Sequence, residues 1–266
     1  MSIKKKRRFS GESGHAGDSL SSAFKGVHMS KKPKNKNANK SQEAEKKAAH
    51  FELRHIKPLT PNQEKVFTSY QKGYHLMLHG FAGTGKTFCA LYLALNEILT
   101  GNSIYNKIVI IRSVVPSRDM GFLPGSMKEK IQVYEEPYRE ICDSLFGRGD
   151  GYDILKMKGL VHFTTTSYLR GITFNNAIVI LDESQNLSFQ ECDTVMTRMG
   201  DESRLIVCGD FRQTDLTKPH EKEGITQLMA ITKRINTFEH VEFQKEDIVR
   251  SGLVKSYIIQ KDAMGL

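Results

Sequence analysis

The chain has 266 residues, of which 39% are hydrophobic, and a formal net charge of +9. This length has room for one large domain or two small ones. No apolar run approaches the roughly 18 residues that a membrane-spanning helix needs. The basic stretch Lys4–Arg8 is followed by polar residues, which do not form the apolar core of a signal peptide. These features argue against a membrane protein and lead us to expect a cytoplasmic location.

The positive charge is unevenly divided along the chain. Residues 1–50 contain 13 Lys and Arg against 4 Asp and Glu, whereas residues 51–266 contain 26 of each sign. The first segment has too few branched aliphatic residues to offset the entropy lost on ordering. We therefore predict a disordered basic tail over 1–50 and a folded domain over 51–266. Such a tail can neutralise nucleic-acid phosphates without reading their sequence; a solubilising segment without a specific partner is the alternative.

The four cysteines are far apart in the sequence, at Cys89, Cys142, Cys192 and Cys208. None of them belongs to a CxxC or Cys/His cluster, so we expect buried, reduced thiols in place of disulfides or a zinc site. The sequence offers no metal site made wholly of side chains.

From about residue 51, short aliphatic segments alternate with longer helical patterns. Strands are expected at 75–78, 107–111, 161–165, 177–181, 205–208 and 239–243. Helices are expected at 61–70, 87–99, 126–145, 188–197 and 224–234. Several of the strands are almost continuously apolar, as in a parallel sheet that is covered on both faces. The alternation predicts an α/β domain with a parallel sheet flanked by helices.

The strongest functional pattern is a GxxxxGK[ST] sequence between an apolar strand and a helix. Its residues are Gly80, Phe81, Ala82, Gly83, Thr84, Gly85, Lys86 and Thr87. Glycines let successive backbone N–H groups point at phosphates, and the helix N-terminus adds partial positive charge. We predict a phosphate loop for ATP, in which Lys86 reaches the β- and γ-phosphates and the Thr87 hydroxyl ligates Mg²⁺. An ordinary glycine turn is the alternative.

Acidic residues follow the apolar strand at 177–181. Asp182 is predicted to hold the metal through its water shell, and Glu183 to act as the base that polarises the attacking water. The alternative is a plain acidic helix start with Ser184 as a local cap. The next strand ends near Asp210 and Gln213, and we predict that Gln213, supported by Asp210, lies beside the γ-phosphate. A polar turn that merely closes the strand is the alternative there.

A helix start precedes the phosphate loop by about 20 residues. Thr60 is expected at the N-cap, Pro61 at the first helical position, and Gln63 as the second member of a capping box.

Together these segments resemble the PhoH family, which groups with the superfamily 1 helicase-like ATPases. The resemblance runs from about Leu59 to Tyr257. It rests on LTPNQ, GFAGTGKT, GFLPGSMKEKI, EEPYREICDSL, LRGITFNNAIVILDESQN, VMTRMG, CGDFRQTDL and FQKEDIVRSGLV in this order. The chain departs from the family pattern after the second expected strand, at 112–116, and at Arg212.

The resemblance implies a RecA-like P-loop domain that hydrolyses ATP with Mg²⁺, in a homo-oligomer such as a hexameric ring. It further implies that Gln63 contacts adenine and that Gln213 couples hydrolysis to single-stranded nucleic acid. Arg250 falls where an arginine finger from one subunit would reach a neighbour's γ-phosphate. An ion pair of Arg250 with Glu246 or Asp247 is the alternative.

Three functions compete at this point. The first is Mg²⁺-dependent ATP hydrolysis coupled to the binding or remodelling of single-stranded RNA or DNA. The second is a nucleotide-dependent binding or assembly switch that hydrolyses slowly and acts through partners. A small-molecule kinase is the third, and it is disfavoured because Glu183 suits water activation and no arginine-rich lid follows the phosphate loop. The balanced charge of 51–266 and the lack of Trp weigh against an aromatic platform for bases.

Overall fold

The computed structural model describes residues 51–113, 127–210 and 224–265, without the side chains of 127–130. A six-stranded parallel sheet forms the centre of the described residues, in the order β3-β2-β4-β5-β1-β6. The strands are β1 (His75–Gly80), β2 (Lys107–Arg112), β3 (Val161–Thr165), β4 (Ala177–Asp182), β5 (Arg204–Gly209) and β6 (Phe238–Phe243). The α-helices are α2 (Pro61–Gln71), α3 (Lys86–Leu99), α4 (Met127–Phe146), α5 (Gly151–Met157), α6 (Phe189–Met196), α8 (Gly224–Thr232) and α9 (Gly252–Ala263).

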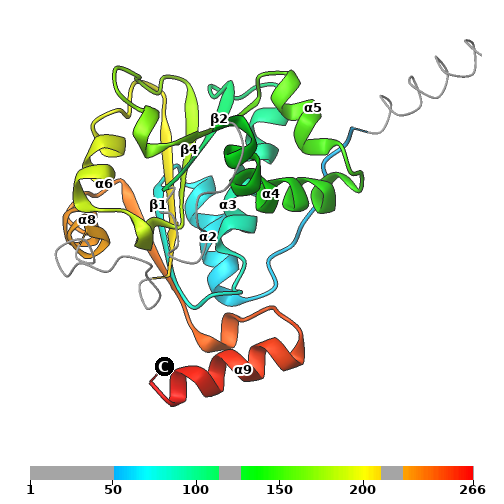
Figure 1. The fold of residues 1–266 in the computed structure, drawn as a ribbon, viewed down its shortest axis with the longest axis vertical. Helices are drawn as coiled ribbons and strands as arrows, with labels where there is room; N and C mark the ends of the chain where they lie inside the picture. The colour runs from blue at the N-terminus through cyan, green and yellow to red at the C-terminus, as the bar shows by residue number, and fades with distance from the viewer. Residues whose placement is uncertain (1–50, 114–126, 211–223, 266) are drawn as a thin grey trace, which may run out of the picture. The chain divides into compact units, whose positions relative to one another are not determined.

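The predicted α/β class with a parallel sheet is confirmed (Figure 1). All six expected strands form, and each boundary lies within two residues of its prediction. Helices α5 and α9 were not predicted. Helix α5 has only 7 residues, and α9 contains no buried residue, so neither has the long apolar stripe by which an amphipathic helix is recognised. The predicted tail over 1–50 lies outside the described residues.

Strand β4 lies at the centre of the sheet, and all six of its residues are buried. Because side chains alternate between the faces of a strand, Ile178 and Ile180 pack on one side and Val179 and Leu181 on the other. Helices on both faces therefore require an uninterrupted apolar strand.

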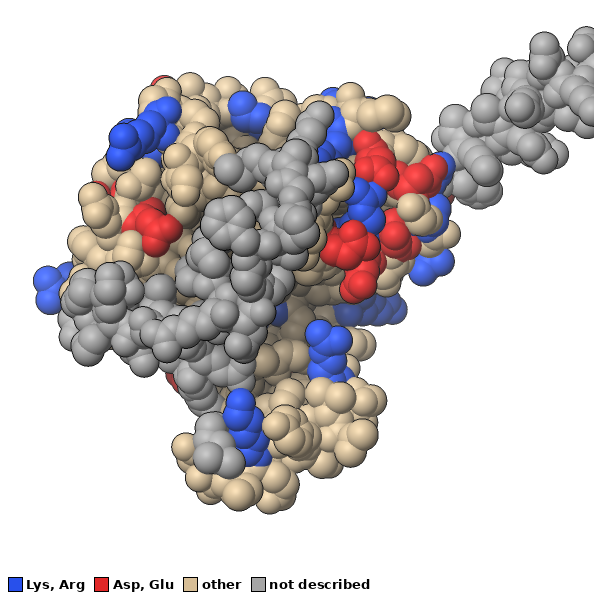
Figure 2. All heavy atoms as spheres, in the orientation of Figure 1, with Lys and Arg blue, Asp and Glu red and all other residues tan. Residues whose placement is uncertain are grey.

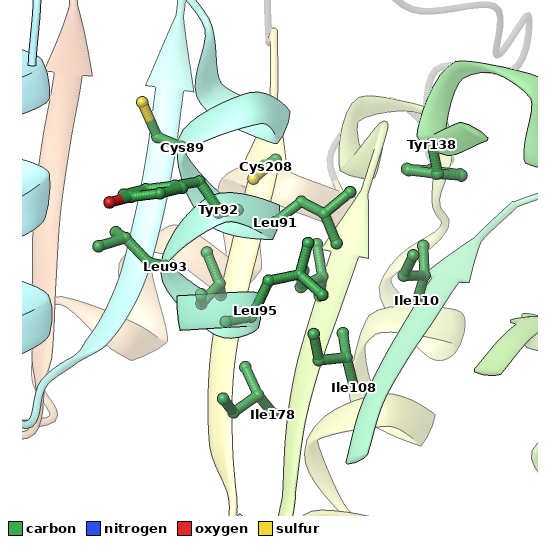
Figure 3. Packing of buried hydrophobic residues seen from close by; sticks show 14 of the residues in the cluster. Cys89, Leu91, Tyr92, Leu93, Leu95, Ile108, Ile110, Tyr138, Ile178 and Cys208 are labelled. Carbon is green, nitrogen blue, oxygen red and sulfur yellow. The ribbon is translucent and has the colours of Figure 1, made fainter. Parts of the chain in front are cut away.

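The two faces of the sheet have separate cores. On one face the apolar residues of α3 pack over β2, β4 and β5, as Figure 3 shows for Leu91 and Leu95 above Ile108 and Ile178. On the other face α6 and α8 contact each other and contribute residues such as Cys192, Val195 and Leu228. All four cysteines are free and buried, as predicted. Among the described residues, no helix is long and apolar enough to cross a membrane.

Parallel strands direct their carboxyl ends to one edge of the sheet. In the order β4-β5-β1, the strand that ends at Asp182 is separated from the strand that ends at Gly80 only by β5. This arrangement brings the phosphate loop and the acidic strand end to the same place, although they are far apart in sequence.

Strand β6 supports the start of the phosphate loop. Gly80 is paired with Phe243 and has a φ of 112°, in a region that side chains rarely adopt. The backbone N–H of Phe81 then donates to the Phe243 carbonyl at 3.2 Å. A Cβ atom at Gly80 would lie 2.1 Å from that carbonyl oxygen, so only glycine fits here.

Shortening a central core residue should lower the free energy of unfolding. We expect Ile180→Ala to cost about 2–5 kcal/mol, because it removes buried methylene groups and leaves a cavity. The matched control is Ile104→Ala, whose side chain is 54% exposed and should cost about 0.5 kcal/mol or less. Urea unfolding followed by circular dichroism measures both, and equal losses would contradict the assignment of Ile180 to the core.

A Cβ atom at Gly80 should be far more damaging than one at a glycine in open space. Gly101→Ala is the control, because Gly101 has a φ of 79° and nothing within 4 Å of the added atom. Gly101→Ala should lower the free energy of unfolding by about 1–3 kcal/mol, from backbone strain alone. Gly80→Ala should add about 1–3 kcal/mol for the contact with Phe243, and thermal unfolding of both variants gives the difference. Equal stabilities would show that the backbone around Phe243 shifts without cost.

Candidate nucleotide-binding site

The phosphate loop connects β1 to the first turn of α3. Gly83 and Gly85 both have positive φ, at 74° and 83°, so the loop uses the backbone freedom that the pattern predicted. The Thr84 hydroxyl is buried and donates to the Phe81 carbonyl at 2.8 Å, which closes a turn within the loop. The N–H of Cys89 donates to the carbonyl of Gly85, so α3 begins directly behind the loop.

Lys86 bends back over the phosphate loop. Its ammonium group donates to the carbonyl oxygens of Gly80 at 2.9 Å and Phe81 at 2.7 Å. Burial lowers the pKa of Lys86, while the carboxylates of Asp210 and Glu183 act in the opposite direction. The lysine is thus aimed at the space that the loop encloses, as expected for a group that contacts phosphate oxygens.

Thr87 and Asp182, the two residues predicted to hold the metal, contact each other directly. The Thr87 hydroxyl donates to Oδ1 of Asp182 at 2.7 Å, although the two residues are 95 positions apart. Asp182 is 4% exposed, and the hydroxyl of Tyr138 donates to its Oδ2 at 2.8 Å. Burial and the nearby Glu183 raise the pKa of Asp182, whereas the hydrogen bonds from Thr87 and Tyr138 lower it.

The donor set at Thr87 and Asp182 fits magnesium. Mg²⁺ prefers oxygen ligands and is usually held by one or two carboxylates, waters and substrate phosphates instead of a cage of side chains. A hydroxyl and a carboxylate side by side, next to a phosphate loop, supply this chemistry. In the described part of the chain, no group of three or more His, Cys, Asp or Glu could hold a metal by itself.

Glu183 has a left-handed backbone conformation, with a φ of 50°, directly after β4. Its carboxylate accepts a hydrogen bond from the Gln185 amide group, and the amide oxygen of Gln185 accepts the backbone N–H of Asp210 at 3.0 Å. The Ser184 hydroxyl donates to the Cys208 carbonyl at 2.9 Å, so it does not act as the local helix cap that the alternative required. The acidic turn is therefore fastened to the end of β5.

Gln63 is at the predicted helix start, and its side-chain amide forms hydrogen bonds with backbone groups of the same chain. Thr60 is the N-cap and Pro61 the first residue of α2, as expected. The Gln63 amide nitrogen donates to the Thr84 carbonyl at 3.0 Å, and its oxygen accepts the N–H of Leu59 at 2.8 Å. The capping box was expected to close on Thr60, and it closes one residue earlier. Adenine contact by Gln63 stays a prediction.

Arg250 lies beside the phosphate loop of its own chain. The Val249 N–H donates to the Gly83 carbonyl at 3.0 Å, and a Cβ atom at Gly83 would be 2.8 Å from Cγ of Arg250. Asp247 is bound elsewhere, by the Asn62 amide at 2.7 Å and the Gln244 backbone N–H at 2.8 Å. A role of Arg250 toward a neighbouring subunit stays a prediction. Gln213 lies outside the described residues.

A cavity of about 740 Å³ opens over these groups. Its lining combines charged and polar residues, among them Lys86, Thr87, Asp182, Glu183, Asp210 and Arg250, with apolar residues, among them Ile56, Leu59, Phe88, Pro137 and Ile141. A volume of this size with such a mixed lining is typical of small-molecule sites.

Sequence reasoning missed two residues of the site, Tyr138 and Gln185. Both stand in stretches that carry the family resemblance, EEPYREICDSL and LDESQN, but those stretches indicate no role for either side chain. A tyrosine in an amphipathic helix is indistinguishable from ordinary core residues until its hydroxyl is seen to meet a carboxylate. Gln185 likewise gains a role only when β4 and β5 lie side by side.

Comparison with known proteins adds the family. A family model described as PhoH-like protein matches residues 55–261. The PhoH-like protein of Bacillus subtilis (strain 168) is 32% identical over 204 residues, which are 76% of this chain and 63% of that protein. Protein PhoH of Escherichia coli (strain K12) is 33% identical over 176 residues, 65% of this chain and 49% of that protein. The chain thus spans less than two thirds of the length of these relatives.

Among solved structures, the large terminase of a thermophilic bacteriophage in complex with ADP superposes with a TM-score of 0.46 and 14% identity. The superposition covers 75% of this chain and 49% of the terminase chain.

The family match over 55–261 includes every described residue of the phosphate loop, the acidic strand end and the Arg250 segment. The chain therefore belongs to the PhoH-like protein family of P-loop NTPases.

Proposed function

We propose that the chain binds ATP with Mg²⁺ and hydrolyses it, and that single-stranded nucleic acid stimulates this turnover. The observation that carries the proposal is the hydrogen bond between Thr87 and Asp182 at the mouth of a phosphate loop. A hydroxyl and a carboxylate in this contact are the protein's share of a magnesium site in P-loop NTPases.

The described side chains divide the chemistry between them. Backbone N–H groups of the loop and the ammonium group of Lys86 bind the β- and γ-phosphates. Thr87 and Asp182 would hold a magnesium ion, which would supply positive charge to offset the negative charge that develops on the phosphate oxygens. Glu183 is attached to the same strand end, one residue further on, and acts as the base that orients and polarises the attacking water.

The position of Glu183 suits this role because Gln185 restrains its carboxylate. A base must keep its geometry within a few tenths of an ångström to be effective, and an unrestrained glutamate samples many rotamers. The Gln185 amide joins Glu183 to the backbone N–H of Asp210. Asp210 in turn precedes Gln213 by three residues in the sequence. This connection supports coupling between the hydrolytic base and the segment predicted to respond to nucleic acid.

Surface charge limits where a nucleic acid would bind. Figure 2 shows acidic side chains gathered over α4 and α5, with basic side chains among them. Ion pairs of these two helices include Arg139 with Asp153 and Lys156 with Glu135. A face whose basic groups are already paired with carboxylates has little charge to offer phosphates. The basic residues of 1–50 supply the excess that the rest of the chain lacks.

Lys86→Ala and Glu183→Gln should separate binding from hydrolysis. Lys86→Ala should abolish saturable ATP binding and turnover, because it removes the main positive charge on the β- and γ-phosphates. Glu183→Gln should still bind ATP but lose about 10²–10⁴-fold in turnover, since an amide does not accept the proton. Phosphate release and equilibrium binding of a fluorescent ATP analogue measure the two effects.

The controls for that experiment keep the same chemical change at another place. Glu202→Gln is matched to Glu183→Gln, because Glu202 also has a positive φ, of 48°, and is exposed. Lys72→Ala removes an exposed lysine at the end of α2. Both controls should behave as the unaltered protein. If Glu183→Gln retained full turnover, the base would have to be another residue.

Single-stranded RNA or DNA should raise ATP turnover several-fold, and Gln213→Ala should bring the ratio of stimulated to basal turnover close to one. Gln227→Ala on α8, which removes an exposed glutamine, is the matched control. Steady-state phosphate release with and without each oligonucleotide gives the ratio. Turnover that ignores both nucleic acids, in a protein that binds ATP, would favour the partner-driven assembly switch.

A further inference from the structure

Helix α4 places one hydroxyl group inside the magnesium end of the site. Tyr138 has no exposed surface, and its ring lies 5.8 Å from the ring of Phe163 between centroids. In Figure 3 it stands beside Ile110 at the margin of the packed cluster. A tyrosine buried among apolar groups needs a partner for its hydroxyl, and this partner is Oδ2 of Asp182.

The hydrogen bond restricts Asp182 in a way that Thr87 alone does not. Thr87 donates to Oδ1 and Tyr138 to Oδ2, so the carboxylate plane is held at both ends. A carboxylate has about four acceptor sites, so two remain for water molecules of a metal's hydration shell. As a metal ligand the Thr87 oxygen would use a lone pair, and its O–H could still donate to Asp182. The Tyr138 hydroxyl would take no part in holding the metal and would serve the Asp182 carboxylate alone.

The position of Tyr138 is itself well supported. The backbone N–H of Arg54 donates to the Leu145 carbonyl at 2.9 Å, and its guanidinium donates to the Ser144 carbonyl at 3.0 Å, so the end of α4 is anchored. Lys156 on α5 forms an ion pair with Glu135, about one turn before Tyr138. Helix α4 also lines the nucleotide cavity, through residues that include Pro137 and Ile141.

We propose that Tyr138 is a positioning residue for the magnesium site, which holds the Asp182 carboxylate in the orientation that receives the metal's water shell. The proposal rests on the proposed function, because the role exists only if Asp182 serves Mg²⁺-nucleotide. It assigns a task in the ATPase site to α4, a helix outside the phosphate loop and the acidic strand end. Groups that orient metal ligands in this way commonly contribute about 10-fold or more to metal affinity.

The test compares nucleotide binding with and without the metal, and it needs no catalysis. Isothermal titration calorimetry gives the Kd of the non-hydrolysable ATP analogue AMP-PNP in excess Mg²⁺ and in EDTA. For the unaltered protein we expect much tighter binding in Mg²⁺. In Tyr138→Phe the Kd in EDTA should be unchanged, while the Mg²⁺-dependent tightening should fall by about 10-fold or more.

The matched control is Tyr152→Phe. Tyr152 is a second fully buried tyrosine, on the adjoining α5, and it is not among the donors to the Asp182 carboxylate. Loss of the Tyr152 hydroxyl should leave the Kd of AMP-PNP unchanged both in Mg²⁺ and in EDTA. A second comparison guards against a general loss of structure in Tyr138→Phe: in an Asp182→Asn background, the same substitution should have no further effect on the Mg²⁺-dependent tightening.

The possible failures are distinguishable. If Tyr138→Phe keeps the full Mg²⁺-dependent tightening, or weakens binding equally in Mg²⁺ and EDTA, the positioning role is wrong while the proposed ATP site stands. If the unaltered protein binds AMP-PNP no better in Mg²⁺ than in EDTA, both the metal site and the role of Tyr138 are overturned.

Discussion

The hydrogen bond between Thr87 and Asp182 depends on the order of the strands, and the candidate site depends on that hydrogen bond. The two residues are 95 positions apart in the sequence. Thr87 lies in the helix that follows β1, and Asp182 is the last residue of β4. They meet because β4, β5 and β1 are consecutive in one parallel sheet, whose carboxyl ends lie at a single edge. The apolar character of β4 and its neighbours is therefore also a requirement of the chemistry, since it keeps these strands in the middle of the sheet.

Backbone contacts around the phosphate loop also fix the position of the candidate site. Gly80 approaches the Phe243 carbonyl so closely that a side chain is excluded. Strand β6 thereby fixes the position of the residue at which the chain leaves β1 and enters the loop. Gln63 spans from the segment before α2 to the Thr84 carbonyl, and Val249 donates to Gly83 from the other side. The loop is thus held from three directions by groups distant in sequence. Such preorganisation lowers the entropy lost when a nucleotide binds.

Two polar side chains extend the site beyond its recognised motifs. Tyr138 brings α4 to the Asp182 carboxylate, and Gln185 connects Glu183 with the N–H of Asp210. A buried polar group that loses such a partner costs roughly 1–3 kcal/mol. The residue proposed to hold the metal and the residue proposed as the base are consequently tied to different parts of the fold, one to a flanking helix and one to the neighbouring strand. A conformational change in either part would reach one of these two carboxylates before the other.

The sequence by itself determined the class of the fold, the six strands and the place of the phosphate-loop motif between a strand and a helix, because these depend on local patterns. Apolar runs such as 177–181, and a glycine-rich loop between a strand and a helix, carry their meaning within a few residues. The tertiary structure alone decided the partners of Gln63, the place of Arg250 at its own phosphate loop, and the contacts of Tyr138 and Gln185. Those features are contacts that folding creates, most of them between residues remote in the chain, and a hydroxyl or an amide has no recognisable role until its partner lies beside it.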